Sequence, residues 1–179
     1  IPNTITNMRA TFRDCISLEK APIIPESAKG LMETSYGCLS LKEVPSLHDG
    51  ITSLDSAFMN CVSLETAPII PNSVKNMDFA FSGCTSLKNP PVIPENVNTI
   101  YKAFYNCSSL KSITIENPKC TISVSSDTIS NTATIYGYKD STAQNYAEKY
   151  ERNFILIDDA PSTTTSTVTT TTPNTTDNL

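Results

Sequence analysis

A cysteine recurs every 23 residues through the first part of this chain, and the residues around it recur with the same period. Leucine stands three residues after each cysteine, and an aromatic residue precedes four of the five by three positions. The five are Cys15, Cys38, Cys61, Cys84 and Cys107. A fixed period of this size is typical of repeat proteins, whose short units stack to share one core. The sequence therefore predicts a stack of five coils.

Each coil is predicted to contain one short strand and one tight turn. Ile113-Thr114-Ile115 alternates as a half-buried strand does. The segment from Phe79 to Cys84 predicts a single helical or 3₁₀ turn, because Gly83 suits a turn-ending position. Four coils carry a proline in the strand segment, namely Pro22, Pro45, Pro68 and Pro91. Because proline cannot donate to a strand ladder, we expect short or interrupted strands.

The repeated unit from Ile70 to Leu87 resembles the BspA-like class of leucine-rich repeats. It has the order Ile-Pro-x-Ser-Val-x-x-Met-x-x-Ala-Phe-x-x-Cys-x-Ser-Leu. The resemblance covers residues 1 to 116 and implies a right-handed, β-rich leucine-rich-repeat solenoid, here of five 23-residue coils. It also implies a place on a cell surface and a role in adhesion or protein binding. The chain departs from the family in its second proline per coil and in the turn at 46–50.

Residues 117–158 leave the repeat and are predicted to form a small α/β unit. Strands are expected at 121–124, 134–137 and 153–157. A short helix is expected after Ser141, a residue type that caps helix N-termini well. The segment is similar to the terminal unit of many BspA-like proteins, which implies a cap over the last coil.

Residues 159–179 are predicted to be a disordered linker rich in Thr, Ser and Pro. Half of the last twenty residues are Thr, and such a segment cannot bury enough apolar area to fold. It resembles linkers that precede a dockerin in secreted gut-bacterial proteins. The chain begins within a repeat and without Met, so we expect it to be a processed or excised fragment.

Composition argues against several classes of function. The net charge is −5, with 13 Lys and Arg, and nucleic-acid binding needs clustered positive charge. No apolar run reaches the roughly 18 residues of a membrane span. The single histidine, His48, is expected on the surface in an irregular turn, without partners for catalysis. We therefore expect no enzyme activity and no cofactor.

Two further residue sets have a chemical and a structural interpretation. The cysteines share one column and should point into the core, which favours free buried thiols over disulfides or a zinc site. Asp55 and Asp78 share a column and resemble the carboxylate pair of a retaining glycosidase. They are expected on an outer face without a cleft, as two solvated acids.

The expected binding surface is the proline column with the variable residues beside it, on the inner, concave side of the solenoid. Exposed apolar stripes with polar rims mark interaction sites, although the prolines are as well explained by coil shape. The set is Lys20, Pro22, Glu43, Pro45, Thr66, Pro68, Asn89, Pro91 and Ser112. A rival set on the outer turn is Arg13, Tyr36, Met59 and Tyr105, which includes typical interface residues.

The sequence is therefore interpreted as a non-catalytic protein-binding, adhesion or scaffold module of a secreted or cell-surface bacterial protein. A protein partner is expected, with a glycan as the other option. The alternative is an accessory module of an extracellular enzyme, or of a cellulosomal, dockerin-bearing protein, whose activity lies outside this chain. Both interpretations place the chain outside the cell.

Overall fold

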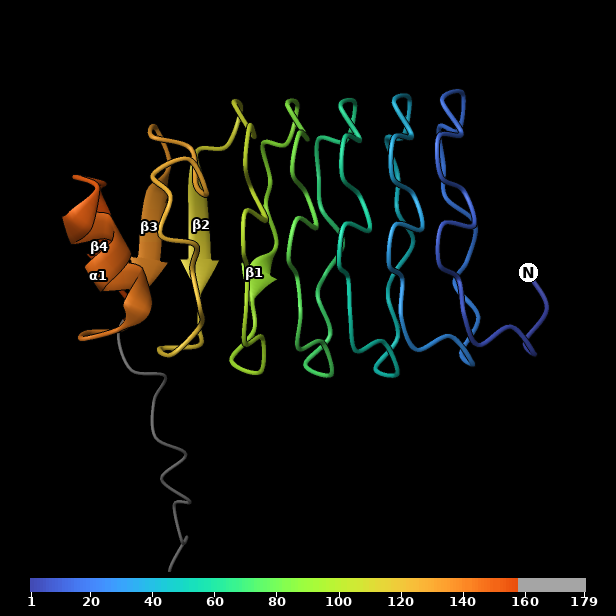
Figure 1. The fold of residues 1–179 in the computed structure, drawn as a ribbon, viewed down its shortest axis with the longest axis horizontal. Coiled ribbons are helices and arrows are strands. Elements are labelled where there is room, and N and C mark those ends of the chain that lie inside the picture. Colours follow the sequence, from blue (N-terminus) through green and yellow to red (C-terminus); the bar gives the residue numbers. More distant parts are fainter. Residues whose placement is uncertain (158–179) are drawn as a thin grey trace, which may run out of the picture.

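The computed structural model describes residues 1–157 as a row of stacked coils closed at one end by a helix (Figure 1). Coils 1 to 5 are numbered here by their cysteines, from Cys15 to Cys107. The regular elements are β1 (Val92–Ile93), β2 (Ser112–Ile115), β3 (Thr134–Gly137), α1 (Thr142–Lys149) and β4 (Phe154–Leu156). The linker expected at 159–179 lies outside the described residues.

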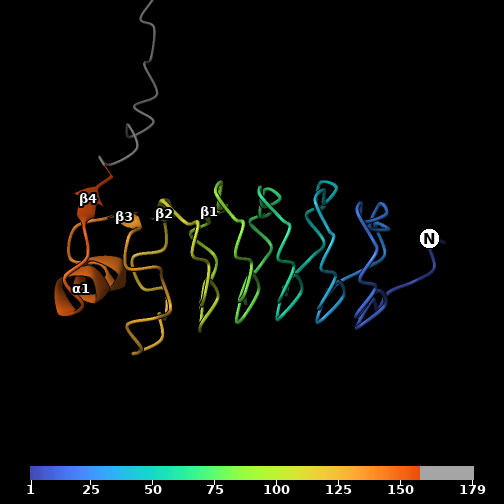
Figure 2. The same ribbon diagram turned by 90° about the horizontal axis from the view of Figure 1, so that it is seen from above.

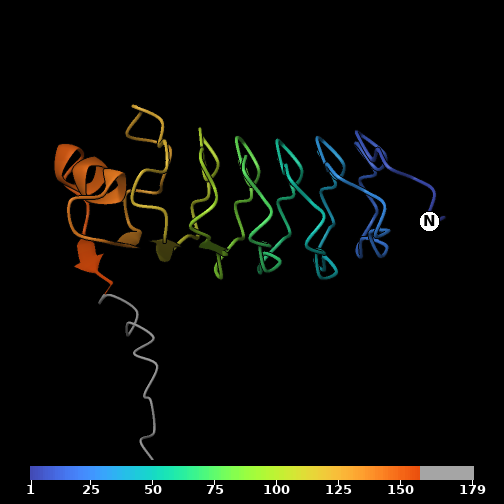
Figure 3. The same ribbon diagram turned by 90° about the horizontal axis from the view of Figure 1, so that it is seen from below.

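The coils stack in a nearly straight row (Figures 2 and 3). The N-terminus lies at one end and α1 lies at the other. The expectation of a concave inner face is therefore wrong for this stack.

The four strands form one parallel sheet in the order β1-β2-β3-β4, on what we call the sheet side. Val92 pairs with Thr114, and Ile113 pairs with Ile135. Before β1 the sheet side has only isolated bridges, Lys20 with Glu43 and Thr66 with Asn89. The prolines of coils 1 to 3 stand two residues after the bridge residues and cannot donate, which ends the pairing there. The prediction of interrupted strands is confirmed.

The return path of each coil, here the turn side, is a run of consecutive tight turns. In coil 4 the N–H groups of Phe79, Phe81 and Gly83 donate to carbonyls of coil 5 at 2.7–2.9 Å. The N–H groups between them close turns within their own coil, as Ala80 does to the carbonyl of Met77 at 3.1 Å. The helical or 3₁₀ turn predicted at Phe79–Cys84 is therefore wrong. Backbone amides that alternate between two directions build a ladder along the stack.

Two columns of residues on the turn side have left-handed backbone conformations. One column follows the Gly and Asn positions expected to end a turn, with φ between 57° and 77°. It consists of Asp14, Gly37, Asn60, Gly83 and Asn106. The other column has φ between 48° and 56° and contains no glycine. It consists of Ala10, Glu33, Ser56, Phe79 and Lys102. Left-handed residues recurring every 23 positions fix the shape of each coil.

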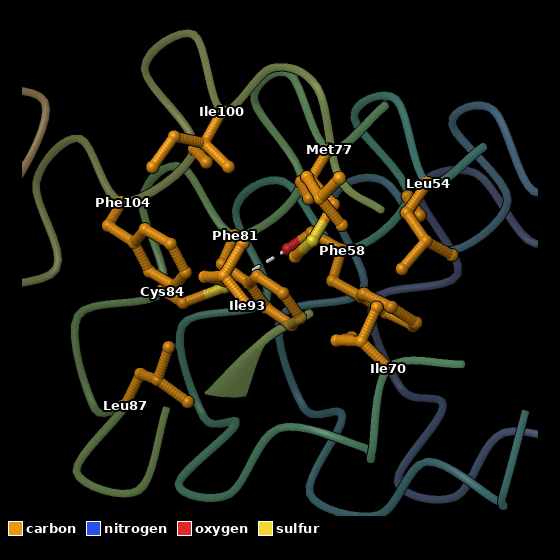
Figure 4. Packing of buried hydrophobic residues seen from close by; sticks show 14 of the residues in the cluster. Leu54, Phe58, Ile70, Met77, Phe81, Cys84, Leu87, Ile93, Ile100 and Phe104 are labelled. Carbon is orange, nitrogen blue, oxygen red and sulfur yellow. Dashed lines mark hydrogen bonds between the residues drawn. The ribbon is translucent and has the colours of Figure 1, made fainter. Parts of the chain in front are cut away.

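The core is one continuous column between the two sides (Figure 4). Phe81 is fully buried and stacks between Phe58 and Phe104, with ring centroids 5.4 and 5.7 Å apart. Leu64 and Leu87 are also fully buried. The recurring apolar columns of the sequence thus become one core that every coil extends.

Residues after coil 5 cover the end of the stack with α1. The hydroxyl of Ser141 accepts a hydrogen bond from the Gln144 N–H at 3.2 Å, which confirms the predicted helix cap. α1 buries its apolar face against β3 at Gly137, where an added Cβ would lie 3.0 Å from Ala143 Cβ. The strand predicted at 121–124 is wrong, since only Thr121 forms a bridge there.

Candidate functional site

The buried cysteines form a hydrogen-bonded ladder through the core. Four of them donate through the thiol to the carbonyl of the residue three positions before the cysteine of the preceding coil, as Cys84 Sγ does to Phe58 O at 3.1 Å (Figure 4). These four are Cys38, Cys61, Cys84 and Cys107. Phe58 O also accepts from the N–H of Cys61 at 3.1 Å. A carbonyl oxygen has two lone pairs, and a thiol is a small side chain that still supplies a donor. The recurring cysteine therefore has a structural role that its spacing alone did not show.

All six cysteines are free, and all but Cys15 are buried. Burial raises the pKa of the Cys61 and Cys107 thiols to about 12, because the thiolate would be desolvated. Burial raises the pKa of the Cys120 thiol to about 12 in the same way. Cys15 belongs to the first coil and is exposed. The buried thiols are therefore unreactive in the folded protein, and Cys15 alone is exposed.

A thiol reagent such as 5,5′-dithiobis(2-nitrobenzoate) should distinguish these environments. At pH 8 we expect native protein to react through Cys15 alone, because thiolate attack requires access as well as deprotonation. Denatured, unreduced protein should react at all six cysteines. A Cys15→Ala control should remove the native reaction. Two or fewer reactive thiols after denaturation would instead establish disulfides.

The sheet side does not expose the proline column as expected. Pro68 and Pro91 are buried, and Pro22 and Pro45 are half-buried, so an exposed proline stripe is wrong. In sheet register Pro91 stands next to Ile113, which faces the core. The prolines thus turn inward and shape the coil.

Four of the variable residues of the predicted set contact one another in two pairs on the sheet side. Lys20 and Glu43 form an ion pair at 2.6 Å, and both are exposed. The hydrogen bond from Lys20 lowers the pKa of the Glu43 carboxyl. Asn89 Nδ2 donates to Thr66 Oγ1 at 3.1 Å. Ser112 is half-buried at the start of β2. The structure therefore brings together Lys20 with Glu43 and Thr66 with Asn89, four residues that we call the polar row, while Ser112 pairs with Thr134 of β3.

Large aliphatic residues beside the prolines form the exposed apolar part of the sheet side. Ile23 is 80% exposed, Ile69 is 86% exposed and Val92 is 48% exposed. Ser46 takes the corresponding position in coil 2. A groove of about 410 Å³ lies beside Ile69 and Val92. The sequence analysis missed these residues, although an aliphatic residue that directly follows the proline in three coils was a readable signal.

The rival set on the turn side is partly engaged in packing within the chain. The Arg13 guanidinium lies 4.3 Å from the centroid of the Tyr36 ring and pairs with Glu33 at 2.7 Å. The Lys102 ammonium lies 5.3 Å from the Tyr105 ring. Met59 is half-buried. These contacts hold the side chains on the turn side in place, and its residues are less exposed than Ile23 and Ile69.

The residues weighed for catalysis are used in local structure. The His48 side chain is 11% exposed and its Nδ1 accepts from the Gly50 N–H at 3.0 Å, so its expected surface position is wrong. Asp78 accepts from Thr99 Oγ1 and from the Tyr101 N–H, at 2.6 and 2.8 Å. Within residues 1–157 no three His, Cys, Asp or Glu side chains are grouped to hold a metal ion. The helices of this described part are also too short to cross a membrane.

Comparison with known proteins gives a match to the repeat. The model of the BspA type leucine-rich repeat region matches residues 5–136 in six copies. The match continues beyond coil 5 into the segment that carries β3. No curated protein matches the chain.

Two solved structures match the chain, and the first of them has a similar fold. The pneumococcal vaccine antigen PcpA is 20% identical with a TM-score of 0.60, over 83% of this chain and 38% of that chain. A leucine-rich repeat protein from Bacteroides ovatus is 18% identical with a TM-score of 0.44, over 73% of this chain and 42% of that chain. This chain therefore matches well under half the length of each of these proteins.

Proposed function

Because this chain belongs to the BspA-type leucine-rich repeat family, we propose that it is a non-catalytic module that binds a protein partner through its sheet side. Modules of this family generally serve protein binding or adhesion at the cell surface. Membership in this family also supports a location outside the cell, on a secreted or surface-attached protein. We also propose that the coils wind in a right-handed direction and that residues 117–158 cap the last coil.

One observation carries the choice of the sheet side. Ile69, a large aliphatic side chain, is 86% exposed beside a groove, and Ile23 is 80% exposed on the same side. Exposed apolar groups rimmed by polar ones mark interaction sites. The rim here is the polar row that includes Thr66 and Asn89. A regular backbone holds both sets of side chains in place before binding, which limits the entropy lost on association.

The test uses a photo-crosslinking amino acid at one of two exposed or half-exposed positions. Asn89 lies on the sheet side and lines the groove, and Tyr36 lies on the turn side. After irradiation on intact cells or extracellular matrix, we expect specific protein adducts from position 89. Adducts that form only from position 36 would move the binding surface to the turn side.

Variants then measure the contribution of each side to affinity for the crosslinked protein. The triple variant Ile23→Ser, Ile69→Ser and Val92→Ser should weaken binding at least tenfold, since exposed aliphatic anchors are lost. The matched triple variant Tyr36→Ala, Met59→Ala and Tyr105→Ala should keep the affinity within about threefold. Equal binding by wild type and both variants would show that the coils act as a spacer.

A further inference from the structure

The ladder on the turn side stops at the last repeat coil. In coil 4 the Gly83 N–H donates to the Tyr105 carbonyl of coil 5 at 2.7 Å. In coil 5 the Ile100 N–H still donates forward, to Thr121 O at 3.0 Å. Asn106, the counterpart of Gly83, makes no such backbone bond within residues 1–157. The chain after Thr121 therefore departs from coil 5 and leaves this donor available.

Side chains of α1 and of the residues just after it hold the segment 125–129 in place. The Tyr146 hydroxyl donates to Ser125 O at 3.1 Å and accepts from the Ile129 N–H at 3.3 Å. The Arg152 guanidinium donates to Ser126 O at 2.7 Å. Tyr146 is buried in α1, so the segment is attached to a folded element. These three hydrogen bonds keep the segment after Thr121 apart from coil 5.

A cleft of about 390 Å³ lies between coil 5 and this segment. Its polar lining includes Asn106 and Ser108 on one wall, and Asp127, Asn131 and Arg152 on the other. Sites for small ligands in proteins have volumes of roughly 300–1,000 Å³ and carry a few convergent polar groups. The cleft meets both criteria.

The lining selects for a neutral ligand that both donates and accepts hydrogen bonds. Asp127 supplies a carboxylate acceptor, and Arg152 supplies a charged donor. The two side chains form no ion pair with each other or with other described residues. An anion would therefore face Asp127, and a cation would face Arg152. Neighbouring hydroxyl groups can use both side chains, and the amide and hydroxyl lining serves them equally.

We propose that this cleft binds a neutral sugar unit. Asp127 accepts hydrogen bonds from the ring hydroxyls, while Arg152 and the free N–H of Asn106 donate to them. The site is separate from the sheet side and would let one module hold a protein and a glycan at different places.

Backbone-amide NMR titration of the full chain tests this proposal. The probes are glucose, galactose, mannose and N-acetylglucosamine, each added to about 100 mM, with acetate and methylammonium as ionic probes. For at least one sugar we expect saturable shifts at Asn106, Ser108 and 127–132, with a dissociation constant of about 1–20 mM. No saturable shift with any of the four sugars would overturn the proposal. Saturation by acetate or methylammonium alone would overturn it in favour of an ion site.

A double variant links any binding to the proposed residues. Asp127→Ala with Asn131→Ala should weaken sugar binding at least tenfold, because it removes an acceptor and an amide from one wall. Asp49→Ala with Asn98→Ala removes the same side chains from exposed positions outside the cleft and should leave binding unchanged. Unchanged binding in the first variant, with its spectrum otherwise preserved, would also overturn the assignment.

Discussion

Phe81→Ala should lower the free energy of unfolding by about 3–5 kcal/mol, measured by urea denaturation at pH 7. Phe81 is fully buried and its ring stacks on two neighbours, Phe58 and Phe104. Truncation removes both stacking contacts and leaves a cavity in the middle of the core. Because each coil rests on the next, the loss cannot be confined to one end of the stack.

Phe79→Ala is the matched control, since it removes the same ring two residues away. Phe79 is half-buried and its ring meets Tyr101 edge-on at 5.3 Å. We expect the control to cost about 1 kcal/mol, as for partly exposed side chains. Equal losses from the two truncations would contradict the placement of Phe81 in the core and of Phe79 on the half-exposed face of the turn side.

Alkaline pH should destabilise the fold through the buried thiols. The pKa of Cys61 and of Cys107 rises from an ordinary value of 9.0 to about 12 in the folded protein. Above pH 9 the unfolded chain releases these protons while the folded chain keeps them. The unfolded state then binds fewer protons, so the free energy of unfolding falls as pH rises. Between pH 9 and 10 the loss is about 1 kcal/mol for each such thiol, because the unfolded thiol is already half deprotonated at pH 9.

Urea denaturation at pH 8, 9 and 10 measures this slope. The double variant Cys61→Ala and Cys107→Ala should have a shallower slope, by about 2 kcal/mol over the last interval. Cys15→Ala is the control variant, since it removes a thiol that is exposed in the folded protein. Identical slopes in all three proteins would mean that other groups cause the alkaline loss.

The architecture of the coils could largely be predicted from the sequence, because equivalent buried positions in successive coils require the same residue types. Positions such as Leu64 and Phe81 are buried in one coil after another, so the same residue types recur every 23 positions. The helix after Ser141 was readable for a related reason, since capping and apolar spacing are local. Each of these signals is carried by side chains that the structure restricts to a few types.

The turn side was predicted wrongly because the left-handed backbone conformation of its residues does not require a particular residue type. The column of Ala10, Glu33, Ser56, Phe79 and Lys102 is left-handed without a single glycine. Such a residue costs roughly 1 kcal/mol, which the ladder of hydrogen bonds to the next coil offsets. Long-range pairing therefore overrides local preference, and no local pattern announces it.

The candidate sites were only partly readable because they depend on how coils meet. The prolines share a column with core residues, which becomes visible only when Pro91 is placed beside Ile113. The cleft near Asn106 exists because the chain leaves coil 5 after Thr121. The cleft depends on how two neighbouring segments lie in space, and the residues of one segment alone do not predict it.

The hydrogen-bond ladder on the turn side also determines how this module responds to mechanical load. Its bonds run from coil to coil along the stack, so tension between the two ends is carried equally by every junction. The weakest junction therefore opens first, and its 23-residue coil releases about 80 Å of chain. The stack then lengthens stepwise under force while the remaining coils stay folded.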